Sequence, residues 1–253
     1  MFKLSRIVIK KFLNEILIKL LNLNEVKIRT SFISCAFKET LSSSLKNSLK
    51  GDYFIPQYLI KMEGMSGRKF RNLLNNIPKY FDKDIKYLEI GTWTGSTLCS
   101  ILFKNRNIKK VAVIDNFSQF GGTRKVLEKN LELIKDNIFC DIQIYSQDFR
   151  SFDFNSCKTK FNIYFFDGPH EYVDHYDSIR LVYDYLDNEF LFIVDDWNWQ
   201  IVRDATNKIL KELNIKILSK IEIFTAKNNK SPRIINRQYS DWHNGYVLLS
   251  CKK

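Results

Sequence analysis

The sequence lacks a disulfide framework, a zinc-binding cysteine pattern and any long apolar run. Its cysteines are odd in number and scattered, with no Cys-x-x-Cys pair among Cys35, Cys99, Cys140, Cys157 and Cys251. This usage is typical of a reducing compartment, so a cytoplasmic location is expected. No apolar run reaches the length needed to span a bilayer. What remains is a globular chain of 253 residues with 45% hydrophobic content, enough to bury a sizeable core.

A secretory leader is also not indicated, although residues 1–23 begin basic and continue apolar as a signal peptide would. Polar residues interrupt the apolar stretch, and no small-residue cleavage site follows it. The apolar residues instead recur at helical spacing, at Phe12, Ile16, Leu20 and Leu23. The expected amphipathic helix either packs on the protein or on a second subunit of a homo-oligomer, or lies at the periphery of a membrane as a basic helix.

Forty Lys and Arg against twenty-eight Asp and Glu give a formal net charge of +12. Such an excess suits an anionic partner, for example nucleic acid, a membrane surface or a phosphorylated substrate. Most of the basic residues are lysines, however, and Asn and Ile are abundant too, a bias that an AT-rich genome produces without a functional cause. The charge therefore leaves both explanations open.

After Asp84, short apolar strands alternate with amphipathic helices. Strands are predicted over residues 85–90, 109–115, 141–149, 161–168 and 190–197, and helices over about 96–105, 123–134, 173–187 and 200–213. This alternation is what a parallel sheet covered on both faces requires. Two late strands, residues 217–226 and 245–251, are predicted to pair antiparallel. The predicted fold is therefore α/β, a doubly wound, mostly parallel seven-stranded sheet with a C-terminal antiparallel strand pair.

The residues before this alternation are mixed in character. Gly64 and Gly67 mark a loop, and Pro78 is expected to end the helix that follows it. We therefore divide the chain into residues 1–83, an N-terminal helical extension with a lid or entry segment, and residues 84–253, the main domain.

Acidic residues recur at the ends of the first five predicted strands. They are Glu89, Asp115, Asp148, Asp167 and the pair Asp195 and Asp196. A single aspartate at a strand end is ordinary turn chemistry. In a doubly wound sheet, however, ligands bind at the carboxyl ends of the strands, near the point where the strand order reverses. The repetition at every strand therefore indicates a ligand site.

The turn after the first of these strands reads Y-L-E-I-G-T-W-T-G-S-T, residues 87–97. A dinucleotide-binding loop would read G-x-G-x-x-G, so that bare backbone approaches a pyrophosphate. Here Trp93 stands in place of the middle glycine, and the acidic Glu89 precedes Gly91. A diphosphate would meet bulk and negative charge, so a cofactor that lacks phosphate and carries a cationic amino-acid part is favoured.

The stretch E-I-G-T-W-T-G-S-T resembles the first motif of class I S-adenosylmethionine-dependent methyltransferases, acidic-x-Gly-x-x-x-Gly. The form is that of the group with macrocin-type sugar O-methyltransferases and, more distantly, catechol-type O-methyltransferases. The resemblance covers roughly residues 60–200, since V-A-V-I-D-N, F-F-D-G-P-H-E-Y and F-I-V-D-D-W-N follow in the same order. It implies a Rossmann-like methyltransferase fold and S-adenosylmethionine as cofactor.

The resemblance also implies roles for the matching residues. Gly91 and Gly95 would let the turn pass under the methionine part of the cofactor, and Glu89 would lie near its amino group. Asp115 would accept hydrogen bonds from both ribose hydroxyls, and Asp148 would lie near the adenine amino group. The expected cofactor-binding set is Glu89, Gly91, Thr92, Trp93, Gly95, Asp115, Asn116 and Asp148.

In metal-dependent relatives, a carboxylate after the fourth strand and an acidic pair after the fifth hold a divalent ion. Asp167, Asp195 and Asp196 match these positions, and three hard oxygen ligands suit magnesium better than zinc. The alternative is that one member of the pair merely caps a helix and that no metal binds. His170, where catechol-type relatives carry a lysine, is the expected proton acceptor, so His170 and Asp167 are the predicted catalytic residues. His175 and His243 are weaker candidates.

The acceptor is less well defined by the sequence. Four aromatic residues either form a wall over the acceptor or pack in the core: Tyr172, Trp197, Trp199 and Trp242. D-G-P-H stands where amino-group methyltransferases often have N-P-P-Y, which favours oxygen as the acceptor atom. We therefore expect a small sugar or phenol rather than nucleic acid. The competing hypotheses are a nicotinamide-dependent oxidoreductase and a non-catalytic binding protein on a methyltransferase fold.

Overall fold

The structure is a computed structural model that describes residues 26–33, 37–51, 54–226, 229–232 and 241–253. The predicted N-terminal amphipathic helix, and with it the expected membrane or subunit contact, lies outside the described residues. Within them, no helix is both long enough and apolar enough to cross a membrane.

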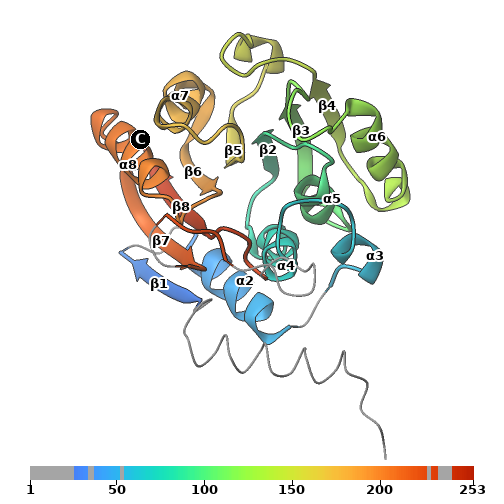
Figure 1. The fold of residues 1–253 in the computed structure, drawn as a ribbon, viewed down its shortest axis with the longest axis horizontal. Helices are drawn as coiled ribbons and strands as arrows, with labels where there is room; N and C mark the ends of the chain where they lie inside the picture. The colour runs from blue at the N-terminus through green and yellow to red at the C-terminus, as the bar shows by residue number, and fades with distance from the viewer. Residues whose placement is uncertain (1–25, 34–36, 52–53, 227–228, 233–240) are drawn as a thin grey trace, which may run out of the picture.

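One eight-stranded sheet runs through the molecule (Figure 1). Its spatial order is β1 (Lys27–Phe32), β7 (Lys216–Phe224), β8 (Tyr246–Lys252), β6 (Leu186–Val194), β5 (Phe161–Phe166), β2 (Ile85–Ile90), β3 (Ile108–Ile114) and β4 (Asp141–Tyr145). The strands from β6 to β4 are parallel, whereas β8 is antiparallel to both neighbours and β1 is antiparallel to β7. The predicted doubly wound sheet with its C-terminal antiparallel pair is confirmed.

Two features of the sheet were not predicted. β1 adds an eighth strand at the edge; its K-I-R-T-S-F is mostly exposed and has only two apolar residues, Ile28 and Phe32, too weak a pattern to mark a strand. β6 begins at Leu186 rather than at residue 190, because the polar residues at its start pair at the end of the sheet, where Glu189 lies opposite Lys252. The helix predicted to reach residue 187 therefore ends earlier, at Val182.

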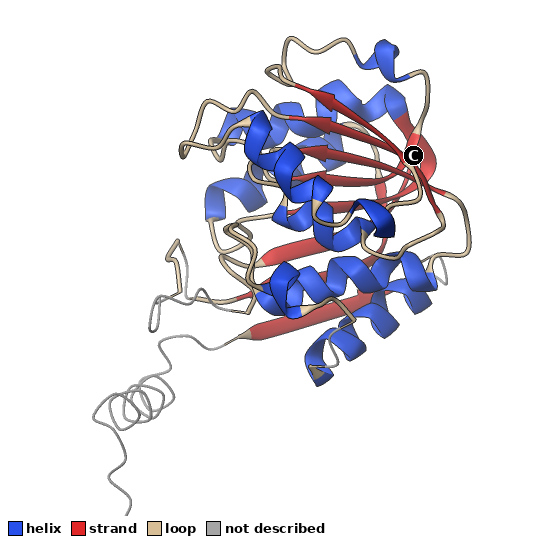
Figure 2. Ribbon diagram, turned by 90° about the vertical axis from the view of Figure 1, so that its right-hand side faces the viewer, coloured by secondary structure: helices blue, strands red, loops and turns tan. Residues whose placement is uncertain are grey.

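Helices cover both faces of the sheet (Figure 2). On one face the core contains side chains from α2 (Lys38–Lys50), α4 (Arg68–Asn76), α5 (Ser96–Leu102) and α6 (Arg124–Glu132), and on the other from α7 (Tyr172–Val182) and α8 (Gln200–Glu212). Side chains of a strand alternate between faces, so Tyr87 joins the first core and its neighbour Leu88 joins the second. The short α3 (Gln57–Ile60) precedes α4.

The segment before residue 84 is joined to the sheet by packing. Leu41 of α2 and Phe70 of α4 lie in the same core as Tyr87 of β2, and the Phe70 ring stacks on Tyr246 of β8. The division at residue 83 stays a prediction, but the described part of the extension shares the core of the main domain.

The strand order reverses at β2, which pairs with β3 on one side and with β5 on the other. The last residues of the parallel strands are in register, because Ile90 of β2 lies opposite both Ile114 of β3 and Phe166 of β5, and Phe166 lies opposite Val194 of β6. The residues that follow these strands therefore start from one level, at the place where a doubly wound sheet binds its ligands.

Candidate active site

A cavity of about 540 Å³ opens at the carboxyl ends of the parallel strands. Its size suits a small-molecule ligand. From the β2–β3–β4 side, six of the eight predicted cofactor residues line it: Gly91, Thr92, Trp93, Asp115, Asn116 and Asp148. From the β5–β6 side come all three predicted metal and catalytic carboxylates with the predicted base: Asp167, His170, Asp195 and Asp196. Two groups of residues that the sequence placed in different roles thus face one cavity.

Gly91 is required by the protein backbone itself. Its φ is +83°, and an added Cβ would lie 2.0 Å from the carbonyl oxygen of Asp167. Gly91 N donates to Ile114 O at 3.0 Å, and Asp167 N donates to Ile90 O at 2.9 Å, so the turn is held between β3 and β5. Glycine is needed here for left-handed backbone and for the close approach of the β5 end, whatever ligand is bound.

Asp115 organises the cofactor side. Its Oδ2 accepts a hydrogen bond from Trp93 N at 2.7 Å, and its Oδ1 accepts one from Phe117 N at 2.6 Å. Trp93 has a φ of +46°, and its indole packs so closely on Gly122 that a Cβ there would lie 1.9 Å from Trp93 Cδ1. The carboxylate therefore holds the turn after β2 in a backbone conformation that a tryptophan rarely adopts.

Glu89 lies beneath the turn, and it does not line the cavity. Its side chain is fully buried, where Oε2 accepts from the Tyr87 hydroxyl at 2.5 Å and Oε1 accepts from the Thr97 hydroxyl at 2.8 Å. Burial raises the pKa of Glu89 to about 7, against the opposing effect of these hydrogen bonds. Its expected contact with a cofactor amino group stays a prediction. The expected role of Gly95, to let the turn pass under the methionine part of the cofactor, also stays a prediction; Gly95 packs against Leu127.

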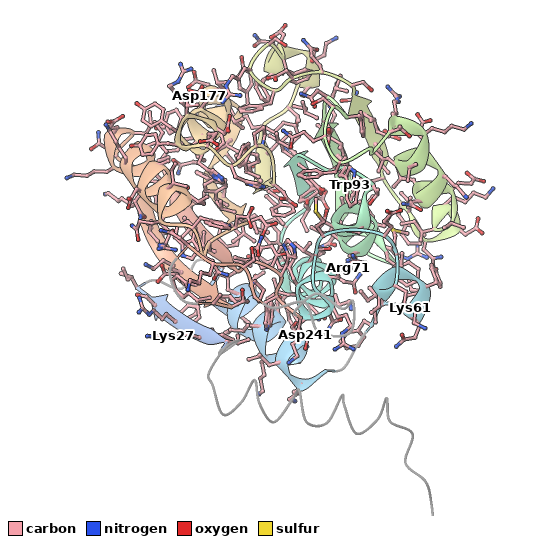
Figure 3. All side chains as sticks on the ribbon, viewed as in Figure 1. Lys27, Lys61, Arg71, Trp93, Asp177 and Asp241 are labelled. Carbon is pink, nitrogen blue, oxygen red and sulfur yellow. The ribbon has the colours of Figure 1, made fainter. Side chains whose placement is uncertain are left out.

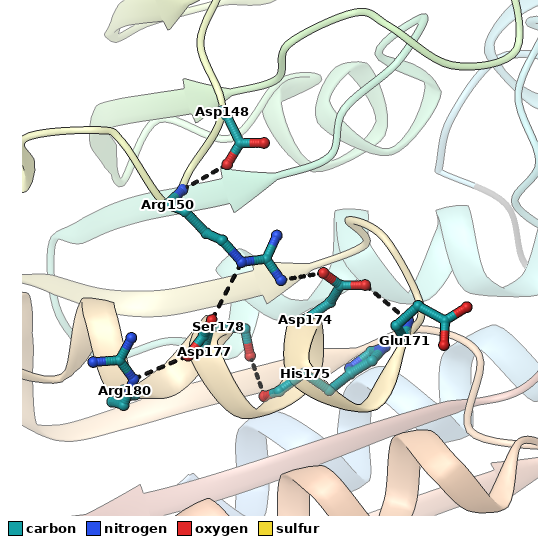
Figure 4. A network of polar contacts seen from close by, with 8 residues as sticks. All are labelled: Asp148, Arg150, Glu171, Asp174, His175, Asp177, Ser178 and Arg180. Carbon is teal, nitrogen blue, oxygen red and sulfur yellow. Dashed lines mark hydrogen bonds and ion pairs between the residues drawn. The ribbon is translucent and has the colours of Figure 1, made fainter.

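Asp148 is tied to the opposite side of the cavity by an ionic network (Figure 4). Asp148 Oδ1 accepts from Arg150 N at 2.8 Å, and the Arg150 guanidinium bonds to Asp174 and, at 3.2 Å, to Asp177 on α7. Asp174 Oδ2 in turn accepts from Glu171 N at 2.8 Å. The loop after β4 and the start of α7, which follows His170 in the chain, are thereby held together.

The three strand-end carboxyls form one buried cluster. Burial, followed by the neighbouring Asp195, raises the pKa of Asp167 well above its ordinary range. Burial and the charge of Asp196 raise the pKa of Asp195 to about 8. Asp195 Oδ1 accepts from Asp196 N at 2.7 Å, and Asp196 has a φ of +56°. The helix after the pair, α8, has Trp199 as its N-cap, and its first backbone N–H, that of Gln200, donates to Asn229 Oδ1 at 2.6 Å. The helix-capping alternative for the pair is therefore wrong.

His170 is bound to this cluster. Its Nε2 lies 2.9 Å from Asp196 Oδ2, and its Nδ1 has no hydrogen-bond partner among the described residues. Burial lowers its pKa, but the hydrogen bond and charge of Asp196 outweigh burial, so the pKa of His170 is raised above its ordinary value. The structure thus gives this imidazole an acidic neighbour on one nitrogen, while the other nitrogen is buried and has no hydrogen-bond partner among the described residues.

The three histidines of the sequence gather at this cluster. His175 is fully buried on α7, its ring centroid lies 5.8 Å from that of His170, and burial lowers its pKa to about 3. His243 lines the cavity, and its ligand atoms and those of Asp195 and Asp196 lie within 4.8 Å of one another. The sequence analysis named His243 only as a weaker candidate. The one sequence feature that could have drawn attention to it is that the chain has only three histidines.

Of the four residues of the predicted aromatic wall, two pack in the core and Tyr172 is exposed. Trp197 and Trp242 are 1% exposed, and Tyr172 is not among the residues that line the cavity. Trp199 does line it, together with Ile201. One of the four aromatic residues is therefore placed to touch an acceptor.

A buried arginine that the sequence did not single out shapes the entrance. Arg71 of α4 is 2% exposed and points back to the loop before its helix (Figure 3). Its guanidinium donates to the carbonyl oxygens of Leu59, Ile60, Met62 and Gly64, and to the Ser66 hydroxyl. Ser66 bonds to Ser96 of α5 at 3.1 Å and lines the cavity with Met65. The expected entry segment is thus held in one conformation from within.

Comparisons with known proteins cover the same part of the chain. Residues 88–197 match a family model described as a methyltransferase domain, a stretch that contains the glycine turn and the acidic pair. An uncharacterised protein of Acanthamoeba polyphaga mimivirus is 29% identical over 204 residues, 74% of this chain and 90% of that protein.

Two similar solved structures are O-methyltransferases. One, from Bacillus cereus in complex with SAH, is 11% identical, covers 84% of this chain and 90% of its own, and has a TM-score of 0.47. The other, TomG from Streptomyces achromogenes in complex with SAM, is 12% identical, covers 85% of this chain and 91% of its own, and has a TM-score of 0.45.

Proposed function

We propose that residues 88–197, which match a methyltransferase domain, are of the class I, S-adenosylmethionine-dependent type. We further propose that this chain methylates an oxygen of a small hydroxylated acceptor, a sugar or a phenol, with the help of a divalent metal ion. One observation carries the proposal. A single cavity joins the glycine turn and Asp115 on one side to His170 and the acidic pair on the other.

The cofactor side fits S-adenosylmethionine. Each oxygen of Asp115 already accepts one backbone N–H, and each has a further lone pair for a ribose hydroxyl. The turn offers backbone and an uncharged indole, and Gly91, Thr92 and Trp93 would lie along the cofactor. When bound, S-adenosylmethionine supplies a methyl group on a sulfonium that an oxygen nucleophile can attack.

His170 is suited to accept the proton that the acceptor hydroxyl must lose. With its Nε2–H donated to Asp196, the neutral ring carries its lone pair on Nδ1, the nitrogen without a partner. Asp196 orients the ring and stabilises the imidazolium that forms, as a carboxylate beside a general base does elsewhere.

The acidic pair that follows β6 fits a divalent cation. Asp196 is 5% exposed, its Oδ2 is bonded to His170, and its Oδ1 is buried with no hydrogen-bond partner among the described residues. A buried carboxylate oxygen without a partner is costly, and a cation would satisfy it. When bound, such an ion would lower the pKa of the acceptor hydroxyl. This matters because a histidine alone would deprotonate only a very small fraction of a sugar hydroxyl near neutral pH.

Oxygen is favoured as the acceptor atom because the residues after β5 are D-G-P-H and not N-P-P-Y. This segment puts a carboxyl and an imidazole at the cavity in place of the amide and ring that often hold an amino group. Trp199 and Ile201 supply an apolar surface on which the ring of a sugar or phenol could lie.

Calorimetry with S-adenosylhomocysteine, with and without a divalent ion, tests the cofactor assignment. Transfer of labelled methyl to a panel of sugars and phenols, with and without EDTA, then tests the reaction. Binding together with EDTA-sensitive transfer to oxygen is the expected result. Binding of a nicotinamide nucleotide in place of S-adenosylhomocysteine would support the oxidoreductase hypothesis. Full transfer in excess EDTA would remove the metal and leave His170 and positioning as the mechanism.

A further inference from the structure

Three potential metal ligands from two distant parts of the chain meet beside the acidic pair. One ligand atom each from Asp195, Asp196 and His243 lies within 4.8 Å of the other two. Metal–ligand bonds of about 2.0 to 2.3 Å allow two ligands on opposite sides of one ion to be about 4.0 to 4.6 Å apart. The three atoms are therefore spaced so that a single cation can contact all of them after a small adjustment.

The second observation is the unsatisfied oxygen of Asp196. Its carboxylate is almost fully buried in the cavity wall, and Oδ1 has no hydrogen-bond partner among the described residues, while Oδ2 is held by His170 at 2.9 Å. Carboxylates that bind a metal are themselves held by hydrogen bonds, and His170 supplies such a contact to Oδ2. The carboxylate is thus held while Oδ1 has no partner among the described residues.

The position of His243 is built into the fold. Its carbonyl oxygen accepts from the Thr225 hydroxyl at 2.7 Å, and Asn198 N donates to the next carbonyl, that of Asn244, at 3.0 Å. Trp197 N donates to Gly245 O at 3.2 Å. Gly245 has a φ of +84°, and a Cβ there would lie 2.4 Å from Ile223 O. The turn that carries His243 is therefore fastened directly to the residues that follow Asp196.

Asp167 does not belong to this group of ligand atoms. It follows β5, one strand farther from β8 than the acidic pair, while His243 enters from the turn before β8, which pairs directly with β6. The antiparallel strand brings an imidazole to the side of the pair opposite Asp167. The third potential ligand beside the pair is thus an imidazole nitrogen, where the sequence pattern alone suggested a third carboxylate.

We propose that the cation site of this protein consists of Asp195, Asp196 and His243, and that it takes a first-row transition ion rather than magnesium. This proposal rests on the metal-assisted methyl transfer proposed above. Imidazole is a ligand for ions such as Mn²⁺, Fe²⁺, Co²⁺ and Zn²⁺, whereas Mg²⁺ prefers oxygen throughout. In this arrangement Asp167 is not a ligand but contacts the ligand Asp195. His170 is not a ligand either, and it holds Asp196 through the contact of its Nε2 with Asp196 Oδ2.

Mn²⁺ binding to the full chain tests the proposal without any methyl transfer. Oxygen-only sites also hold Mn²⁺ well, so the deciding measurement is the electron spin-echo modulation from a directly bound imidazole nitrogen. The wild type should show this signal, and His243→Ala should lose it and bind Mn²⁺ about 10-fold or more weakly. His170→Ala is the matched control: it removes the neighbouring imidazole, and it should keep the nitrogen signal even if affinity falls. Asp167→Asn should keep both signal and affinity.

S-adenosylhomocysteine calorimetry on each variant, together with its circular dichroism, checks that the fold and the cofactor side are intact. Loss of Mn²⁺ binding in Asp167→Asn, with no nitrogen signal in the wild type, would overturn the proposal and establish a three-carboxylate site. A wild type that binds S-adenosylhomocysteine but no Mn²⁺ at millimolar concentration would also overturn it, while leaving the methyltransferase function standing. His243→Gln repeats the test should His243→Ala fold poorly.

Discussion

The two sides of the cavity differ in whether their ionisable side chains have hydrogen-bond partners within the protein. On the β2–β3 side the carboxylates already have partners within the protein: both oxygens of Asp115 accept backbone N–H groups, and both oxygens of Glu89, beneath the turn, accept hydroxyls. The atoms without a partner among the described residues on this side are neutral ones, Thr92 Oγ1 and Trp93 Nε1. On the β5–β6–β8 side partners are missing, since Asp196 Oδ1 and His170 Nδ1 have none among the described residues.

This difference indicates a division of labour. A side whose carboxylates are already held by the protein keeps its shape whether or not a ligand is present, which suits the repeated binding of one cofactor. A side with unpartnered buried atoms is stabilised by what enters it, and it holds the groups that can accept a proton or a cation. Substitutions on the first side should therefore change stability and cofactor affinity, and those on the second should change ion binding and turnover.

The largest effect is expected from His170→Ala. Losing a general base lowers turnover by about 100-fold to 10,000-fold. Because the base must be unprotonated to act, wild-type activity should rise with pH through its titration, and this acidic limb should disappear in the variant. Cofactor affinity, measured by calorimetry, should not change, because His170 lies on the other side. An unchanged pH profile would show that another group takes the proton.

Gly91→Ala should destabilise the protein by up to about 4 kcal/mol, since the new Cβ meets the Asp167 carbonyl in a left-handed backbone. Gly51→Ala is the matched control: its φ is +78°, nothing lies within 4 Å of the added Cβ, and it should cost only about 1 kcal/mol. Urea denaturation of both variants measures the difference. Equal losses of stability would mean that the Asp167 carbonyl after β5 moves aside at no cost. Gly91 would then be required for cofactor binding alone and not for the fold.

Glu89→Gln should remove a pH dependence of stability. Because the pKa of Glu89 in the folded protein is raised from 4.5 to about 7, the wild type should lose stability as pH rises through this window, by about 3 kcal/mol in all, and no further above it. The variant should follow a flatter curve and gain relative to the wild type as pH rises, which denaturation at pH 4, 6 and 8 measures. Parallel curves would show that Glu89 ionises without cost.

The smallest effect is expected from Asp115→Ala, which should weaken S-adenosylhomocysteine binding by about 1.5 to 3 kcal/mol, as for other hydrogen bonds to charged groups. Asp115→Asn, which retains one acceptor oxygen, should lose less. Both variants should leave Mn²⁺ binding unchanged, because the ion site lies across the cavity. If Asp115→Ala also lost Mn²⁺, the two sides would not be independent.

Much of the cofactor side could be predicted because its residues lie close together in the sequence. The strand, the two glycines and the acidic residue that precedes them fall within residues 85–97, and Asp115 directly follows the very next strand. Local patterns of this kind report apolar runs and backbone needs directly. Even here the physical role of Gly91 was visible only in three dimensions, since the atom it avoids belongs to Asp167.

By itself, the sequence determined the alternation of strands and helices, and with it the level at which Asp115, Asp167 and the acidic pair emerge, because side-chain periodicity and strand ends are local properties. Only the tertiary structure decided that a ligand atom of His243 lies within 4.8 Å of those of Asp195 and Asp196, and that Asp167 is not part of that group. That choice depends on β8 returning antiparallel alongside β6, a pairing between residues far apart in the chain that no local pattern records.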